Sequence, residues 1–182
     1  MQDIKKVSMV MYENKTLNEK VIKLLKEHPE GGEKFFNALD LLVRSDRGIL
    51  DDFIAWSIKY IKDYYRLVEN INTNESIGIV LTGKFGNAVI SNYAAGLHKE
   101  FADVLVVNGD IRVGAIPEIY RDSFEIKKYV LLDDSFYSGT TMLGIEKAMQ
   151  EIDSAVHIAH ACVIYDGSKE PNDNVSSLYK YY

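Results

Sequence analysis

The fold is decided by the stretch Tyr129-Val130-Leu131-Leu132-Asp133-Asp134-Ser135-Phe136-Tyr137-Ser138-Gly139-Thr140-Thr141, in which an apolar run meets two acids and a hydroxyl-rich turn. The apolar residues 129–132 predict a strand inside a sheet, because an unbroken apolar run suits a strand that is covered on both faces. Asp133 and Asp134 would then emerge at the carboxyl end of that strand. Open α/β sheets bind their ligands at this end.

The turn after the acids has the composition of an anion site. A helix is predicted over 140–152, because its apolar residues repeat on one stripe, so Ser138, Gly139, Thr140 and Thr141 form the helix entrance. Free backbone N–H groups and the helix dipole favour an anion there, and glycine permits close approach. Two carboxylates beside a phosphate suit a ligand with ribose hydroxyls and a divalent cation that balances the charge.

The rest of the chain from Ser76 onward alternates short apolar runs with amphipathic segments. Strands are predicted over 77–81, 104–107 and 156–164, and a helix over 87–101. This order predicts an α/β fold, a central, mostly parallel sheet with helices on both faces. Residues 108–125 lack periodicity and suggest a long loop or irregular hairpin of the kind that often covers an active site.

The N-terminal region, residues 1–75, reads as helical. One helix would run from a Thr16 cap to Gly31, a second over 33–43, and a third from about Asp51, with a polar turn over 44–48. We expect one domain over 1–182, made of this helical region, an α/β core over 76–165 and a C-terminal tail over 166–182.

Composition limits the possible partners. The chain has 182 residues, a formal charge of −6 and a pI of about 5.2, which argues against a nucleic-acid or anionic-membrane surface. No segment reaches membrane-spanning length, and Cys162 is the only cysteine, which fits a reducing compartment. The expected location is the cytoplasm.

The run from Val130 through Asp134, followed by residues 138–141, resembles the signature of type I phosphoribosyltransferases. In that family apolar residues precede two acids and a Ser/Thr-Gly-x-Thr turn. The resemblance implies an enzyme that takes 5-phosphoribosyl-1-pyrophosphate (PRPP), with Mg²⁺, and transfers its ribose phosphate to a nitrogenous base. It also implies a homodimer. Asp133 and Asp134 would contact the ribose hydroxyls and, through them or water, the Mg²⁺, while Tyr137, Ser138, Gly139, Thr140 and Thr141 would wrap the 5′-phosphate.

A second strand-turn-helix unit resembles the family's pyrophosphate loop. The strand over 77–81 is followed by Thr82-Gly83-Lys84-Phe85-Gly86-Asn87. By this resemblance Gly83, Lys84 and Phe85 would meet the pyrophosphate, and Arg112 from the loop over 108–125 is a further candidate. A plain Gly-containing turn before a helix, with a solvated lysine, is the alternative.

The accepted base stays open, orotate-like or purine. Arg44-Ser45-Asp46-Arg47-Gly48 resembles the Ser-Gly-Arg hairpin of the orotate branch, and Tyr165-Asp166-Gly167 stands where that branch has Val-Asp-Arg. Tyr137 and the lysine-free loop favour a second hypothesis, a non-catalytic PRPP- or nucleotide-binding regulator of the same fold. A third hypothesis is an α/β interaction domain with a vestigial phosphate turn. Structural roles are expected for His157, His160 and Cys162.

Overall fold

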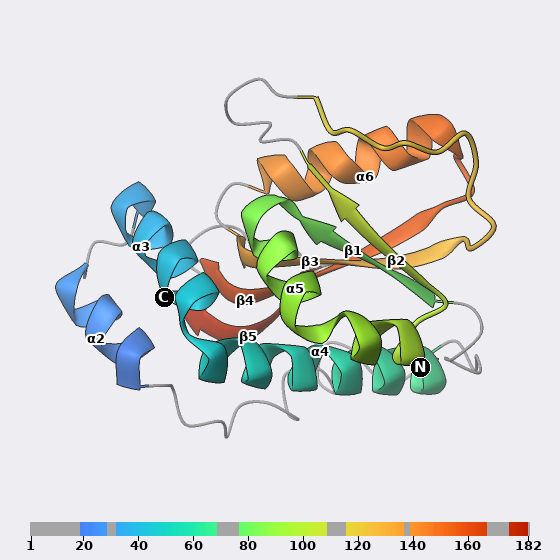
Figure 1. Cartoon of the computed structure of the whole chain (residues 1–182). Helices are drawn as coiled ribbons and strands as arrows, with labels where there is room; N and C mark the ends of the chain where they lie inside the picture. The colour runs from blue at the N-terminus through green and yellow to red at the C-terminus, as the bar shows by residue number, and fades with distance from the viewer. Residues whose placement is uncertain are drawn as a thin grey trace.

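The computed structural model describes residues 19–28, 32–68, 77–108, 116–136, 139–166 and 175–181. These residues form a sheet in the order β2-β1-β3-β4-β5 with helices around it (Figure 1). The strands are β1 (Ile77–Thr82), β2 (Asp103–Val107), β3 (Lys128–Phe136), β4 (His157–Asp166) and β5 (Val175–Tyr181). Every neighbouring pair is parallel, so the predicted α/β fold with a parallel sheet is confirmed.

Strand β3 is longer than predicted, and this changes the place of the two acids. The strand continues through Asp133 and Asp134 to Phe136, so the prediction that the acids follow the strand was wrong. Pairing of β3 with β1 ends at Leu81↔Leu132, whereas pairing with β4 goes on to Phe136↔Tyr165. Hydrogen bonding to β4 keeps the charged residues in extended backbone after β1 has turned away.

Strand β5 was not predicted, because its residues were assigned to a C-terminal tail. It pairs in parallel with β4 over registers that include Ala161↔Ser176 and Ile164↔Tyr179. Its sequence, VSSLYKY, has only weak apolar alternation. A strand of this kind is specified by the open edge of β4 rather than by its own pattern.

The helices are α2 (Glu19–Glu27), α3 (Gly32–Ser45), α4 (Arg47–Val68), α5 (Gly83–Glu100) and α6 (Thr140–Ile152). The bounds of α6 match the prediction, but α4 and α5 each begin four residues earlier than expected. The predicted polar turn over 44–48 shrinks to Asp46 alone, whose carboxylate accepts the N–H of Ile49 at 3.2 Å and so caps α4. The predicted Thr16 cap and Gly31 lie outside the described residues.

Helices cover both faces of the sheet, as predicted. On one face α3, α4 and α5 pack on alternate strand residues, Ile77, Ile79, Leu81, Val130, Leu132, Ala161 and Val163. On the other face α6 packs, through Met142, Ile145 and Met149, on Val80, Leu131 and Cys162. Figure 1 shows α6 and α4 on opposite sides of the sheet, with α3 beside the end toward which β4 and β5 point.

A polar network closes the opposite end of the sheet. Tyr129, near the start of β3, lies across Gly78 and donates its hydroxyl to Asp103 at 2.8 Å. Arg121 binds the same carboxylate with both terminal nitrogens, at 2.5 and 2.9 Å. Arg121 thus lies at the amino end of the strands and fixes the segment over 116–127 to the sheet.

The described part of the loop over 108–125 has no strand or helix, and an isolated antiparallel bridge, Asn108↔Glu118, closes it. The prediction of an irregular hairpin fits this geometry. None of the helices in the described ranges combines the length and apolar character needed to cross a membrane.

Candidate active site

The strand order places a ligand crevice between β1 and β3. From β1 the chain moves to β2 on one side, and the next strand, β3, lies on the other side. The connecting helices α5 and α6 consequently cover opposite faces, and the ends of β1 and β3 separate at this point. Open α/β sheets bind ligands in this crevice, outside the carboxyl ends of the strands. Most of the predicted site residues follow these two strand ends.

Asp133 lies one residue beyond the last register that β3 shares with β1, and it is half-buried. Its Oδ1 accepts the hydroxyl of Thr82, the last residue of β1, at 2.7 Å and the backbone N–H of Asp134 at 2.9 Å. Two donors on one oxygen hold the carboxylate in one orientation. The role of Asp133 as a ligand for a ribose hydroxyl stays a prediction.

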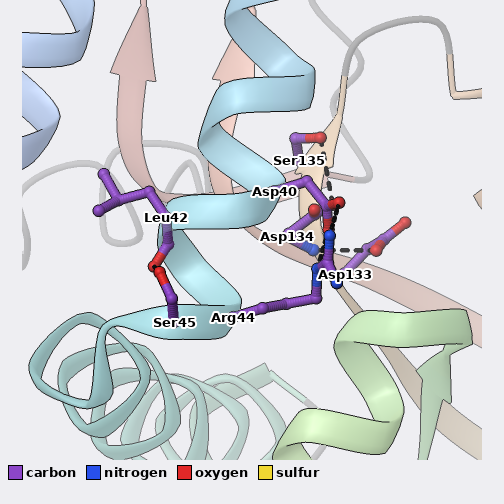
Figure 2. A network of polar contacts seen from close by, with 7 residues as sticks. All are labelled: Asp40, Leu42, Arg44, Ser45, Asp133, Asp134 and Ser135. Atoms are coloured by element: carbon purple, nitrogen blue, oxygen red, sulfur yellow. Dashed lines mark hydrogen bonds and ion pairs between the residues drawn. The ribbon is translucent and has the colours of Figure 1, made fainter.

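Asp134 points the other way, toward α3 (Figure 2). Its side chain is 8% exposed and forms a hydrogen bond with Asp40 of α3, and Ser135 Oγ lies 3.2 Å from its Oδ1. Burial above all, then the charge of Asp133 and the contact with Asp40, raises the pKa of Asp134 well above its usual range. The carboxyl of Asp134 thus holds its proton more tightly than an ordinary aspartate does, and its hydrogen bond with Asp40 joins β3 to α3.

Asp40 keeps its charge because Arg44 lies one helical turn further along α3. The Nε and an Nη of Arg44 bind the two carboxylate oxygens of Asp40 at 2.8 and 2.6 Å. Burial by itself would raise the pKa of Asp40, but the hydrogen bonds with Asp134 and Arg44 outweigh it and hold the pKa below its usual range. The hydrogen bond between Asp40 and Asp134 fixes helix α3 onto the second acid of the predicted signature.

The start of α6 has the backbone that the phosphate turn requires. Gly139 occupies the N-cap position with φ +72° and ψ −2°, and no side chain caps the helix there. A Cβ on Gly139 would lie 2.5 Å from Cζ of Phe136, so a larger residue would require the Phe136 ring to shift and would also have to adopt the positive φ. Thr140 is exposed and Thr141 is half-buried in the first turn of α6.

The start of α5 also has a glycine with a positive φ. Gly83 has φ +46°, with open space where a Cβ would be, and Lys84 is exposed. The positive charge of Lys84 contributes to the lowered pKa of Asp40, which places it near the acids. The Phe85 side chain is 2% exposed and packs edge-on against Phe53, with the ring centroids 5.6 Å apart, so only its backbone could serve the ligand.

Three predicted site residues, Tyr137, Ser138 and Arg112, lie outside the described residues. Three residues that contact the two acids or their partners were not among the predicted site residues: Thr82, Asp40 and Arg44. Asp40 and Arg44 are spaced i, i+4, as ion pairs on a helix surface are, but sequence gave no reason to place α3 against β3. Thr82 was predicted only as the first residue of the turn after the strand over 77–81, whereas in the structure it ends β1.

The histidines and the cysteine have the structural places expected of them. His157 is exposed and His160 is 2% exposed, on opposite faces of β4. Burial lowers the pKa of His160 to about 4 and raises that of Glu146, whose Oε2 lies 3.2 Å from Nε2 of His160, so this contact is not an ion pair at neutral pH. Cys162 is fully buried beside Asp133 in the sheet.

Comparison with known proteins gives the fold. No family model and no curated protein matches the chain. A xanthine-guanine-hypoxanthine phosphoribosyltransferase from Helicobacter pylori is similar in structure, with a TM-score of 0.50 and 16% identity over 72% of this chain and 82% of that chain. A purine phosphoribosyltransferase from Pyrococcus horikoshii has a TM-score of 0.51 and 14% identity, over 73% and 83%. The chain has the type I phosphoribosyltransferase fold.

Both of these proteins are named for purines or purine bases. The predicted polar turn over 44–48, on which part of the resemblance to the orotate branch rested, is reduced to Asp46, because Ser45 ends α3 and Arg47 begins α4.

Proposed function

We propose that this protein is a phosphoribosyltransferase that transfers the 5-phosphoribosyl group of PRPP to a nitrogenous base, with release of pyrophosphate. One observation carries the proposal. Helices α5 and α6 follow the carboxyl ends of the neighbouring parallel strands β1 and β3, each has a positive-φ glycine at its start, and neither N-cap residue makes a side-chain cap hydrogen bond. The hydroxyl of Thr82, at the end of β1, binds Asp133 of β3. A ligand with two phosphate groups and a ribose between them fits this order of anion sites and acceptor.

Each described element has a part in the proposed reaction. The start of α6, with Gly139, Thr140 and Thr141, would bind the 5′-phosphate, and the start of α5, with Gly83 and Lys84, the pyrophosphate. A base nitrogen forms a bond to C1 of the ribose as the bond from C1 to the pyrophosphate oxygen breaks, and the pyrophosphate leaves with the electron pair. Asp133, held by two donors, would bind a ribose hydroxyl and stabilise the positive charge on C1.

Mg²⁺ fits this site as a cation shared with the ligand. No three His, Cys, Asp or Glu side chains are grouped as a cation cage within the part of the chain that the structure describes. Mg²⁺ commonly binds through one or two carboxylates and the phosphates of a substrate, an arrangement that Asp133 can supply. When bound, it would neutralise the leaving pyrophosphate. The homodimer and the cytoplasmic location stay predictions.

The names of the structurally similar proteins make purines the first bases to test. We propose to measure pyrophosphate release from PRPP and Mg²⁺ with guanine, hypoxanthine, xanthine, adenine and orotate. The matched controls are Asp133→Asn, which should lower turnover strongly, and Gly96→Ala in α5, whose new methyl group would enter open space. No release with any base, or equal release by the Asp133→Asn variant, would contradict the proposal.

A second candidate function is a sensor that binds PRPP or a nucleotide without turnover. The observation that favours it is the hydrogen bond of Asp40 to Asp134, because α3 occupies the second acid that the family signature assigns to the ribose. Calorimetric titration separates the two functions. Binding of PRPP or a nucleoside 5′-monophosphate without pyrophosphate release would support the sensor.

A further inference from the structure

We propose that Thr82 is a positioning residue of the reaction described above, which acts by fixing the carboxylate of Asp133 across the crevice. The inference rests on the proposed function and adds a residue to it. Neither the family signature nor the glycine turn accounts for a hydroxyl at this position.

The hydrogen bond between Thr82 and Asp133 is short, and its donor residue is buried. Thr82 is 4% exposed, and its Oγ1 donates to Oδ1 of Asp133 at 2.7 Å, across 51 residues of sequence. A hydrogen bond from a hydroxyl to a carboxylate at this distance is charge-assisted and strong. It acts beyond Leu81↔Leu132, the last paired register of β1 and β3, so it joins the two strands after their backbone ladder has ended.

The hydroxyl of Thr82 does not make the helix-capping hydrogen bond that is usual at its position. Thr82 is the N-cap residue of α5, with extended backbone at φ −107° and ψ 135°, yet it makes no side-chain cap hydrogen bond. A threonine at an N-cap usually accepts a backbone N–H of the first turn, which stabilises the helix. Elsewhere the chain uses this device, since Asp46 accepts the N–H of Ile49 at the start of α4.

Because Thr82 donates to Asp133 and does not cap α5, two consequences follow. The first-turn N–H groups of α5 have no side-chain cap from Thr82 to compete with an anion, and the Asp133 carboxylate gains a second fixed donor besides the N–H of Asp134. Both consequences serve a ligand that spans the two strand ends, whereas a purely structural threonine would cap its own helix. The geometry thus couples the proposed pyrophosphate site to the proposed ribose site.

The test compares Thr82→Val, which keeps the shape and removes the hydroxyl, with Thr82→Ser, which keeps the hydroxyl. If Thr82 orients Asp133, the valine variant should lose about 10- to 100-fold in kcat/KM, mostly in kcat, the range of one charge-assisted hydrogen bond. The serine variant should stay within about threefold of wild type. Ser91→Ala is the matched control, because Ser91 donates to the Asn87 carbonyl in the same helix at an exposed position.

A double variant identifies the route of the effect. In the Asp133→Asn background, Thr82→Val should change residual turnover or PRPP affinity by less than about twofold, because the partner charge is already lost. The inference is overturned if Thr82→Val lowers the melting temperature but leaves kcat/KM at 20 °C unchanged, or if its effects multiply with those of Asp133→Asn. If wild type neither binds PRPP nor releases pyrophosphate, the proposed function fails and takes this inference with it.

Discussion

Gly139 is the residue whose replacement separates the structural and ligand-binding demands of the phosphate turn. In Gly139→Ala the new Cβ would lie 2.5 Å from Cζ and 3.0 Å from Cε2 of Phe136, which is itself 7% exposed. The ring must therefore shift within a packed region, which costs about 1–3 kcal/mol. The φ of +72° adds about 1–2 kcal/mol for a residue with a Cβ.

Together these costs amount to roughly 2–5 kcal/mol, which for a chain of this size corresponds to a fall in melting temperature of roughly 5–15 °C. From the sequence, glycine was expected at this position because it permits close approach of an anion. The contact with Phe136 shows that the fold is affected as well, so binding must be measured well below the melting temperature of each variant.

Two other glycines of the chain provide the comparison. Gly83 also has a positive φ, of +46°, but its Cβ would meet nothing within 4 Å, so Gly83→Ala should cost only the backbone term of about 1–2 kcal/mol. Gly96 is helical with open space around it, and Gly96→Ala should be neutral or stabilise by up to about 1 kcal/mol. The predicted order of destabilisation is Gly139, then Gly83, then Gly96.

Thermal melts rank stability, and calorimetric titration of PRPP ranks affinity. At 20 °C the Gly139→Ala variant should bind PRPP at least about tenfold more weakly than wild type, because the methyl group and the displaced ring enter the site of close backbone approach. A Gly139→Ala variant that melts with wild type would refute the packing argument. A Gly139→Ala variant that melts at a lower temperature than wild type but binds PRPP with wild-type affinity would refute the proposed 5′-phosphate site at the start of α6.

Three further predictions concern charges. Removing Mg²⁺ with EDTA should weaken PRPP binding in calorimetric titration, because the Asp133 carboxylate would then face a bare pyrophosphate, and equal affinity would contradict the cation's role. Asp133→Asn should lower turnover with little change in the denaturant midpoint of unfolding. Asp134→Ala should destabilise the fold by about 1–3 kcal/mol, since Asp40 loses a buried donor. A larger loss of stability in Asp133→Asn than in Asp134→Ala would count against the burial of Asp134. His160, with its pKa lowered to about 4, stays neutral in the fold while the unfolded chain takes up a proton near pH 6.5, so stability should fall by up to about 3 kcal/mol as pH drops from 6.5 to 4. Urea unfolding of His160→Leu should show a shallower fall over this window, and parallel curves would exclude His160 as the cause.

Much of the core could be predicted from the sequence because its signals are local. The apolar runs of β1 and β2 and the stripe of α6 are repeated within a few residues, and the observed elements match them closely. The glycine before α6 was identified as an anion turn for the same reason: its neighbours in sequence are its neighbours in space.

Other features depended on partners far along the chain. Strand β5 exists because β4 offers an open edge, and β3 runs on through two acids because β4 continues to pair with it. Neither fact leaves a mark on the apolar pattern of those residues. The expected ends of the elements were accordingly the least accurate part of the sequence-based interpretation.

The division of the two adjacent acids was decided by the tertiary structure alone. From the sequence, Asp133 and Asp134 were equivalent ligands for a ribose. In the fold successive strand residues face opposite sides, so Asp133 meets Thr82 in the crevice while Asp134 is buried against Asp40 of α3. The sequence predicted two carboxylates near the carboxyl end of β3, but only packing could decide which of them has its pKa raised, because the cost of a buried charge depends on neighbours more than ninety residues away in the chain.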